Sequence, residues 1–247
     1  MFRTIRVGRL FGFPVEVNLS FLLLLGFFVV WLGPITGMMF VAIAFGSVLL
    51  HELGHALMAR HLRIPVAGIE LHFFGGAAKL MAPPRTPGDE IAVAAAGPAV
   101  SFALGGLGLA IAALTGWQVA SLLGWINLIM ALFNLVPALP LDGGRIFRAL
   151  LQRRTGFLRA TEISVAVARV AAVSLGVIGL FTLHLYFVLL AVLLWSMGTA
   201  ELAVARHNAP LMQEDTVRVY PNGYVPEDPK RPPPGGPRIV RVRLTRP

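Results

Sequence analysis

The chain has 247 residues, room for one ordinary domain. Hydrophobic residues make up 56% and charged residues only 13%, with a mean hydropathy of +0.75. A water-soluble enzyme and a disordered chain are both excluded, because soluble domains carry roughly a quarter charged residues and disordered ones few apolar residues. The absence of cysteine excludes disulfides, thiolate metal sites and a cysteine nucleophile.

Six apolar stretches are long enough to cross a hydrocarbon core about 30 Å thick. They cover residues 17–35, 38–59, 91–114, 119–139, 163–181 and 185–200. Links as short as 115–118 and 182–184 make their flanking spans antiparallel neighbours. Arginines precede the first stretch as in a signal peptide, but no small-residue cleavage site follows, which predicts a retained span.

The distribution of positive charge predicts the orientation of these spans. The net charge is +9, from 21 basic and 12 acidic residues. If the N-terminus is cytoplasmic, the three outer loops near 33–37, 115–118 and 182–184 contain no Lys or Arg, and only Arg169 lies within a span. This asymmetry follows the positive-inside rule. The positive charge is therefore interpreted as a topology signal, with both termini cytoplasmic, and nucleic acid is not an expected partner.

Two segments do not fit a spanning helix. Residues 64–82 contain two short apolar runs around Gly75–Gly76, which predicts a β-hairpin that turns at these glycines and dips into the membrane edge. Residues 206–247 are rich in Pro and Arg and predict a cytoplasmic tail. Within it, 216–225 and 238–244 alternate like strands, with Asn222–Gly223 as a turn signal for a small ribbon.

The expected fold class is therefore an all-α polytopic membrane protein with about six transmembrane helices and a small membrane-associated β-hairpin. Residues 1–205 form the expected transmembrane domain, with a core at about 38–150. Glycines 105, 106 and 108 in the third span are expected to allow close helix packing, and Asn127 in the fourth to bond between helices.

The sequence His51–Glu52–Leu53–Gly54–His55 is an HExxH motif near the cytoplasmic end of the second span. Residues i and i+4 share one face of a helix, so both imidazoles can reach one metal ion, and Glu52 can take a proton from water at the metal. Random placement would give roughly 0.005 such motifs in this chain. Counted back from Arg60, His55 lies about 7 Å and His51 about 13 Å inside the inner interface.

A catalytic zinc site needs a third protein ligand and one open position. Asp142 is the favoured candidate, because Pro137 and Pro140 would open the fourth span at the depth of the histidines. Asp89 and Glu90 are alternatives, although a helix start facing solvent accounts for both. His72 on the hairpin is a further, less favoured candidate.

These motifs resemble the site-2 protease family of intramembrane zinc metalloproteases. HELGH at 51–55 matches the zinc motif, and FNLVPALPLDGG at 133–144 matches the second signature, NxxPxxxxDG. FGGAA at 74–78 resembles the glycine pair of a membrane-associated hairpin, and Ala96–Gly97–Pro98 the start of the third core helix. The resemblance covers about residues 40–150, in a minimal member without PDZ or CBS domains.

The resemblance implies one zinc ion held by His51, His55 and Asp142, with Glu52 as the catalytic base. It also implies that Asn134 holds substrate or stabilises the oxyanion. An exposed hairpin edge could add an unwound substrate segment as a strand, with Gly75 and Gly76 allowing close approach.

The expected activity is cleavage of membrane-spanning segments of single-pass proteins in the bacterial inner membrane. The active site would lie toward the cytoplasmic side. The substrate would be a membrane-anchored protein, and the sequence does not define an oligomeric state. A metal transporter and a noncatalytic scaffold derived from the protease are the alternatives.

Overall fold

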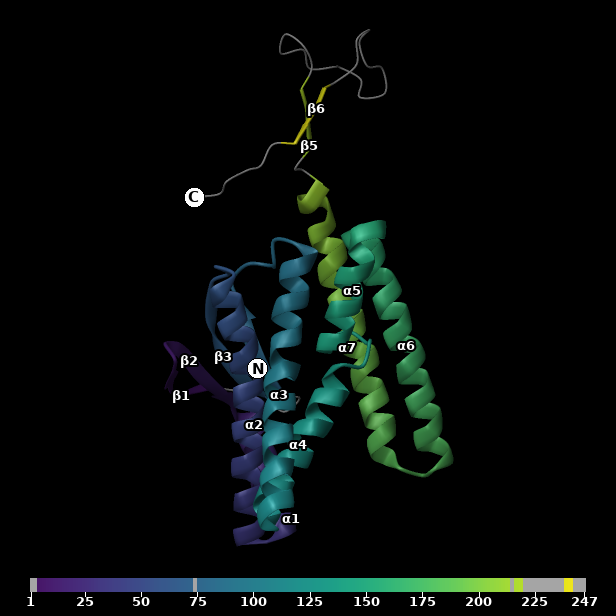
Figure 1. The fold of residues 1–247 in the computed structure, drawn as a ribbon. Coiled ribbons are helices and arrows are strands. Elements are labelled where there is room, and N and C mark those ends of the chain that lie inside the picture. Colours follow the sequence, from purple (N-terminus) through teal and green to yellow (C-terminus); the bar gives the residue numbers. More distant parts are fainter. Residues whose placement is uncertain (1–3, 73–74, 214–215, 220–237, 242–247) are drawn as a thin grey trace.

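The computed structural model describes residues 4–72, 75–213, 216–219 and 238–241 (Figure 1). Seven helices form the bulk of this part of the chain, and the four strands between residues 4 and 80 flank them on one side. The helices are α1 Leu19–Leu32, α2 Pro34–His61, α3 Pro87–Thr115, α4 Gln118–Asn134, α5 Asp142–Thr155, α6 Phe157–Phe181 and α7 Leu185–Gln213. The strands are β1 Thr4–Leu10, β2 Phe13–Asn18, β3 Val66–His72, β4 Gly75–Leu80, β5 Thr216–Val219 and β6 Arg238–Arg241.

Four of these helices, α2, α3, α6 and α7, are long and apolar enough to cross a membrane. The other two predicted spans are present as shorter apolar helices, α1 and α4. The expectation of six spanning helices is therefore supported for four. The first span starts two residues later than predicted, because Val17 belongs to β2, and α1 ends at Leu32 before Gly33, which has a φ of +86°.

The fourth predicted span is interrupted as the prolines suggested. Helix α4 ends at Asn134, an irregular segment carries Pro137 and Pro140, and α5 begins at Asp142. Helix α5 was not expected from the sequence, because its polar, arginine-containing composition is not that of a membrane span. The irregular segment brings the start of α5 to the middle of the bundle, beside α3 (Figure 1).

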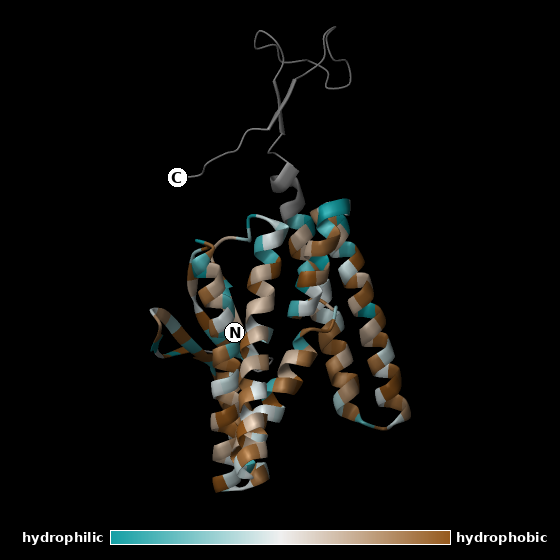
Figure 2. Ribbon diagram, viewed as in Figure 1, coloured by the Kyte–Doolittle hydropathy of each residue, from teal (hydrophilic) through white to brown (hydrophobic). Residues whose placement is uncertain are grey.

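Polar and apolar residues separate along the helices (Figure 2). Brown, apolar ribbon covers most of the helix lengths, whereas teal ribbon gathers at the end where α3 begins and α5 joins α6. The turns after α1, α3 and α6 lie at the opposite end (Figure 1). This separation is consistent with a membrane protein whose basic end is the predicted inner side.

Close packing of α3 on α4 depends on glycine. A Cβ at Gly108 would lie 2.7 Å from the Gly124 nitrogen, and one at Gly105 would lie 3.2 Å from the Leu128 nitrogen. Gly106 has nothing within 4 Å of its Cβ position, so the packing role predicted for it is wrong. Asn127 donates to Ser47 Oγ of α2 at 2.8 Å, which confirms the interhelical bond predicted for this residue.

The predicted hairpin is half of a larger sheet. Strands β1–β2–β3–β4 form one four-stranded sheet in that order, with β2 and β3 parallel and the other pairs antiparallel. Residues on one face of β2 and β3 are buried against Phe21 of α1 and Leu53 of α2; these are Phe13, Val17, Ile69 and Leu71. The N-terminal strands were not predicted, because their arginines were interpreted only as a topology signal.

The glycines of the hairpin do not make its turn. Gly75 and Gly76 begin β4 and pair with His72 and Leu71 of β3, so both glycines belong to the strand. The expectation of a turn at Gly75–Gly76 is therefore wrong. Strand β4 is an edge of the sheet and contacts α2.

Three charged side chains, one each from β2, β3 and β4, meet on the opposite face of the sheet. Lys79 Nζ lies 2.7 Å from Glu70 Oε2 and 3.2 Å from Glu16 Oε2. The hydrogen bond from Lys79 lowers the pKa of the Glu70 carboxyl, and the same bond raises the pKa of the Lys79 amine. This face therefore carries charge where the other face is apolar.

In the tail, β5 and β6 pair antiparallel, as the alternation of the sequence predicted. Helix α7 continues to Gln213, beyond the predicted span end at 200. The predicted turn at Asn222–Gly223 lies outside the described residues.

Candidate metal centre

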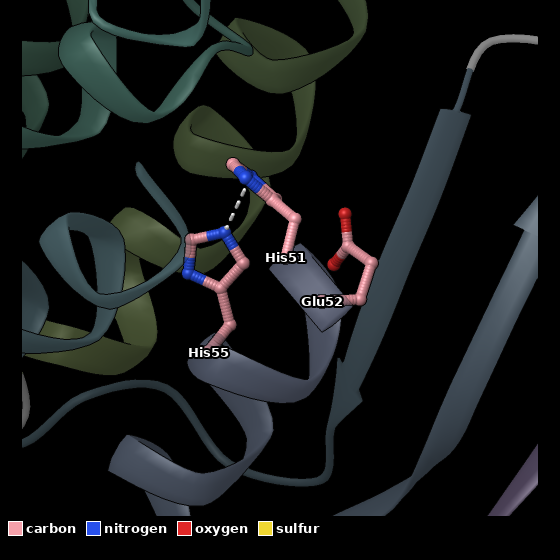
Figure 3. A group of neighbouring side chains, drawn as sticks. All are labelled: His51, Glu52 and His55. Atoms are coloured by element: carbon pink, nitrogen blue, oxygen red, sulfur yellow. Dashed lines mark hydrogen bonds between the residues drawn. The ribbon is translucent and has the colours of Figure 1, made fainter. Parts of the chain in front are cut away.

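The two histidines of the HExxH motif lie on one face of α2, as their spacing predicted. His51, Glu52 and His55 are all buried, and their ligand atoms lie within 4.8 Å of one another. Figure 3 shows the two imidazoles turned toward each other, while the Glu52 side chain turns to the other side, toward a strand of the sheet. The motif thus presents two ligands and one separate carboxylate.

Asp142, the first residue of α5, completes a triangle with the histidines. Its Oδ2 lies 3.2 Å from His51 Nε2 and 3.2 Å from His55 Nε2, and the two Nε2 atoms are 3.2 Å apart. Ligand atoms about 2.0–2.1 Å from a tetrahedral zinc lie about 3.3–3.4 Å from one another. The three atoms therefore fit three corners of a zinc tetrahedron and leave the fourth open.

The outer nitrogens of both imidazoles are also engaged. His55 Nδ1 lies 2.7 Å from the Val93 carbonyl oxygen, and His51 Nδ1 lies 2.9 Å from Ser101 Oγ, both on α3. A carbonyl oxygen only accepts, so His55 carries its proton on Nδ1 and directs the lone pair of Nε2 into the triangle. Such outer contacts orient ligating histidines and raise their basicity.

The Asp142 carboxyl is placed to ligate beside the imidazoles. Its Oδ2 faces both Nε2 atoms, and a carboxylate oxygen is an ordinary zinc ligand.

The other candidate ligands have different roles. Asp89 forms a capping box with Thr86 at the start of α3, and Glu90 is buried against Arg148, so the expectation that solvent accounts for Glu90 is wrong. His72 lines the cavity beside the triangle and is not one of its three ligand residues. The favoured third ligand, Asp142, is the one that meets the histidines.

Two glycines, Gly97 and Gly76, allow close contacts with the HExxH motif. A Cβ at Gly97 would lie 2.2 Å from His55 Nε2 and 2.7 Å from His51 Nε2, so α3 can face the imidazoles only with glycine here. A Cβ at Gly76 of β4 would lie 2.3 Å from Glu52 Cγ. Glu52 Oε2 also accepts a hydrogen bond of 3.0 Å from the Ala78 backbone nitrogen.

The triangle opens into a cavity of about 250 Å³. Side chains of α4, α5 and α7 and the edge strand β4 line it, including Asn134 and Gly76. The Asn134 amide donates one hydrogen bond to the Met130 carbonyl at 3.0 Å, which leaves its second N–H for the cavity. Gly75 is not among the residues that line this cavity.

Ser101 and Val93 were not predicted from the sequence as partners of the histidines. A signal for Ser101 was present, because it follows Gly97 by four residues and so shares the helix face that meets α2. Val93 contributes only a backbone oxygen, which no side-chain pattern reveals.

Replacing Ser101 by Ala should lower zinc affinity about 10- to 100-fold, because His51 would lose the contact that orients its ring. The dissociation constant can be measured by competition with a zinc chelator on the purified protein. Ser121→Ala in α4 is a control of the same chemistry. Equal affinities for the Ser101 variant and the unmodified protein would contradict the role given to Ser101.

A site with three protein ligands and an open fourth position, inside a bundle of apolar helices, is typical of a catalytic metal centre in a membrane protein. The sequence model of Peptidase family M50 matches residues 39–119 and 111–178. The chain belongs to this family, which confirms the resemblance to site-2 proteases.

Known proteins similar to this chain carry consistent names. A protein of Synechocystis named as a zinc metalloprotease, sll0528, is 42% identical over 176 residues, covering 63% of this chain and 46% of the relative. Zinc metalloprotease MJ0392 of Methanocaldococcus jannaschii is 31% identical over 201 residues, covering 78% of this chain and 58% of the relative. The chain spans about half the length of the curated relatives it matches.

The fold also matches a solved structure, the site-2 protease from Methanocaldococcus jannaschii. The TM-score is 0.66 at 29% sequence identity, covering 81% of this chain and 95% of the other.

Proposed function

We propose that this protein is an intramembrane zinc metalloendopeptidase that cleaves the membrane-spanning segments of single-pass proteins. The observation that carries the proposal is that the two histidines and the glutamate of the HExxH motif point to different neighbours. His51 and His55 meet Asp142 in a zinc-sized triangle, while Glu52 stands apart, beside an edge strand and a cavity. The site would hold one zinc ion through these three ligands.

The chemistry of the proposed site follows from its residues. A bound zinc ion supplies Lewis acidity, which lowers the pKa of water to about 7. Glu52 would take the proton of the attacking water and pass it to the leaving amine. The free N–H of the Asn134 amide would donate to the oxygen of the scissile carbonyl as its negative charge develops.

The edge of β4 would hold the substrate in extended form. A transmembrane helix hides its peptide bonds in internal hydrogen bonds, so a segment must unwind before it is cut. Because the Ala78 N–H points to Glu52, and so away from β3, this edge of the strand faces the catalytic motif. A segment added here would place its backbone beside Glu52, whose own approach to the strand depends on Gly76.

Cysteine cross-linking can test this strand addition, because the chain has no cysteine of its own. With Ala77→Cys in the enzyme, single cysteines along the unwound substrate segment should cross-link at every second position, since strand side chains alternate. Cross-linking at every third or fourth position would contradict an extended substrate and indicate a bound helix. An enzyme with Gly8→Cys in β1, the far edge of the sheet, is the control.

The proposed location is the bacterial inner membrane, with both termini in the cytoplasm and the site open toward that side. The basic residues support this orientation, because the turns after α1, α3 and α6 carry no Lys or Arg.

A single reconstitution experiment separates the protease from a metal transporter and from a noncatalytic scaffold. In proteoliposomes with a single-span substrate, zinc removal by a chelator should stop cleavage and zinc addition should restore it, without zinc crossing the bilayer. Zinc flux without cleavage would favour the transporter. Zinc binding with neither cleavage nor flux would favour the scaffold.

A further inference from the structure

One cation lines the candidate active cavity without a partner. Arg145, in the first turn of α5, is the single Lys or Arg among the described residues that line this cavity. Its side chain is partly buried and, within the described part of the chain, makes no hydrogen bond or ion pair. An unpaired charge beside the buried triangle needs a reason, because desolvation of a charge is costly.

Arg148, the next arginine on the same helix, has a structural role and serves as a comparison. Arg148 is buried and donates to Glu90 of α3 at 3.0 Å and to Glu201 of α7 at 2.8 Å. It joins three helices and leaves no carboxylate of this cluster free. Arg145 has no comparable partner, although it lies only one turn away.

The carboxylates in the described part of the chain are all engaged elsewhere. Each accepts a bond from a lysine, an arginine, a histidine or a backbone nitrogen; they are Glu16, Glu52, Glu70, Asp89, Glu90, Asp142, Glu162 and Glu201. None of them pairs with Arg145. Helix stability does not explain the position either, since a cation near a helix N-terminus is unfavourable.

We propose that Arg145 is a specificity-determining residue that binds a carboxylate of the substrate close to the scissile bond. This inference rests on the proposed function. The carboxylate belongs to an Asp or Glu side chain of the unwound segment or to a chain terminus that ends there. Apolar side chains of α7, such as Leu193 and Met197, wall the same cavity, and a low-dielectric surround strengthens a charged pair.

The helix geometry limits where the carboxylate must lie. Arg145 follows Asp142 by three residues, so their Cβ atoms are about 5–6 Å apart on one face of α5. An extended substrate rises about 3.3 Å per residue. The recognised acid should therefore lie within about three residues of the bond that is cut, and no further along the segment.

The test compares charged and neutral substrates of the same shape. A single-span substrate with a mapped cut site is given Asp or Asn, one position at a time, at the three residues on either side. The full-length protein in proteoliposomes should cut the Asp form with kcat/KM about tenfold higher at one or two of these positions, mainly through KM. A further pair of substrates ends at the favoured position with a free carboxylate or an amide, which tells a chain terminus from a side chain.

Variants of the enzyme then assign the preference to Arg145. Arg145→Gln should bring the ratio of kcat/KM for the Asp and Asn forms close to one, and Arg145→Glu should prefer Lys at the same position. Arg159→Gln, which removes an exposed arginine paired with Glu162 outside the cavity, should keep the preference. Zinc content is measured for each variant and should stay unchanged.

Three results would overturn the inference. One is the same preference for Asp in Arg145→Gln, and another is an equal slowing of every substrate by that variant. The third is equal cleavage of Asp and Asn forms by the unmodified protein, which would leave the proposed function standing. Failure of the unmodified protein to cut any substrate would instead overturn the proposed function, and this inference with it.

Discussion

Replacing Glu52 by Gln is expected to lower cleavage about 10²- to 10⁴-fold while the protein keeps its zinc. General acid–base catalysis supplies a rate factor of this size, and a glutamine amide takes no proton from water. The ligand triangle does not include Glu52, so the ion should remain. The amide oxygen can still accept the Ala78 N–H bond, so the edge strand should stay in place.

Cleavage of a co-expressed single-span substrate and the zinc content of the purified protein are the two measurements for this variant. Glu162→Gln is the control, because Glu162 pairs with Arg159 and Arg206 at the polar end of α6. Unchanged cleavage in Glu52→Gln would contradict the assignment of Glu52 as the base. Loss of zinc together with activity would show that Glu52 helps to hold the metal.

Replacing Gly97 by Ala is expected to abolish zinc binding and cleavage together. The added methyl group would lie 2.2 Å from His55 Nε2 and 2.5 Å from His55 Cε1, so this imidazole could not stay where it is. Helices α2 and α3 are already in close contact beside this position, because a Cβ at Gly54 would lie 2.8 Å from the Ala96 carbonyl oxygen. The packing therefore has no free space to take up the methyl group. If the imidazole turns, its 3.2 Å contacts with His51 and Asp142 are lost; if α3 moves away from α2 together with α5, which packs on α3, Asp142 leaves the histidines.

Zinc per protein molecule, measured by metal analysis, should fall from about one to near zero in Gly97→Ala. Gly106→Ala is the matched control, since it lies in the same helix with nothing within 4 Å of the Cβ position. It should keep its zinc and gain slightly in helix stability, because Ala is favoured over Gly in a helix. Full zinc content in Gly97→Ala would contradict the steric argument.

The apolar helices could be predicted from the sequence because each is a local pattern of composition. The breaks at Pro137 and Pro140 were also local, since proline lacks the N–H that a helix needs. Strands β1 and β2 could not be predicted in the same way. They are stabilised by parallel pairing of β2 with β3, about 50 residues further along the chain, and such long-range pairing leaves no local signal beyond alternation.

The candidate site also contains features that the sequence predicts and features that it does not. The spacing of His51 and His55 fixes their shared face, and Asp142 follows from the proline break that brings α5 to the middle of the bundle. Contacts made by backbone atoms, such as the Val93 carbonyl and the Ala78 nitrogen, could not be predicted, because backbone groups are common to nearly all residue types and leave no sequence signal. The requirement for Gly97 became clear only when the facing imidazoles could be placed.

Glu52 and an added substrate strand would compete for one hydrogen-bond donor, the backbone N–H of Ala78. An added substrate strand would need outward-facing backbone donors of β4, and the Ala78 N–H, at the centre of this edge, already donates to the Glu52 carboxylate. Full pairing of the substrate would therefore displace Glu52 from the strand and free both of its oxygens for water. Arrival of the correct extended segment and release of the base would then be one event, and a cavity without substrate would keep its base restrained.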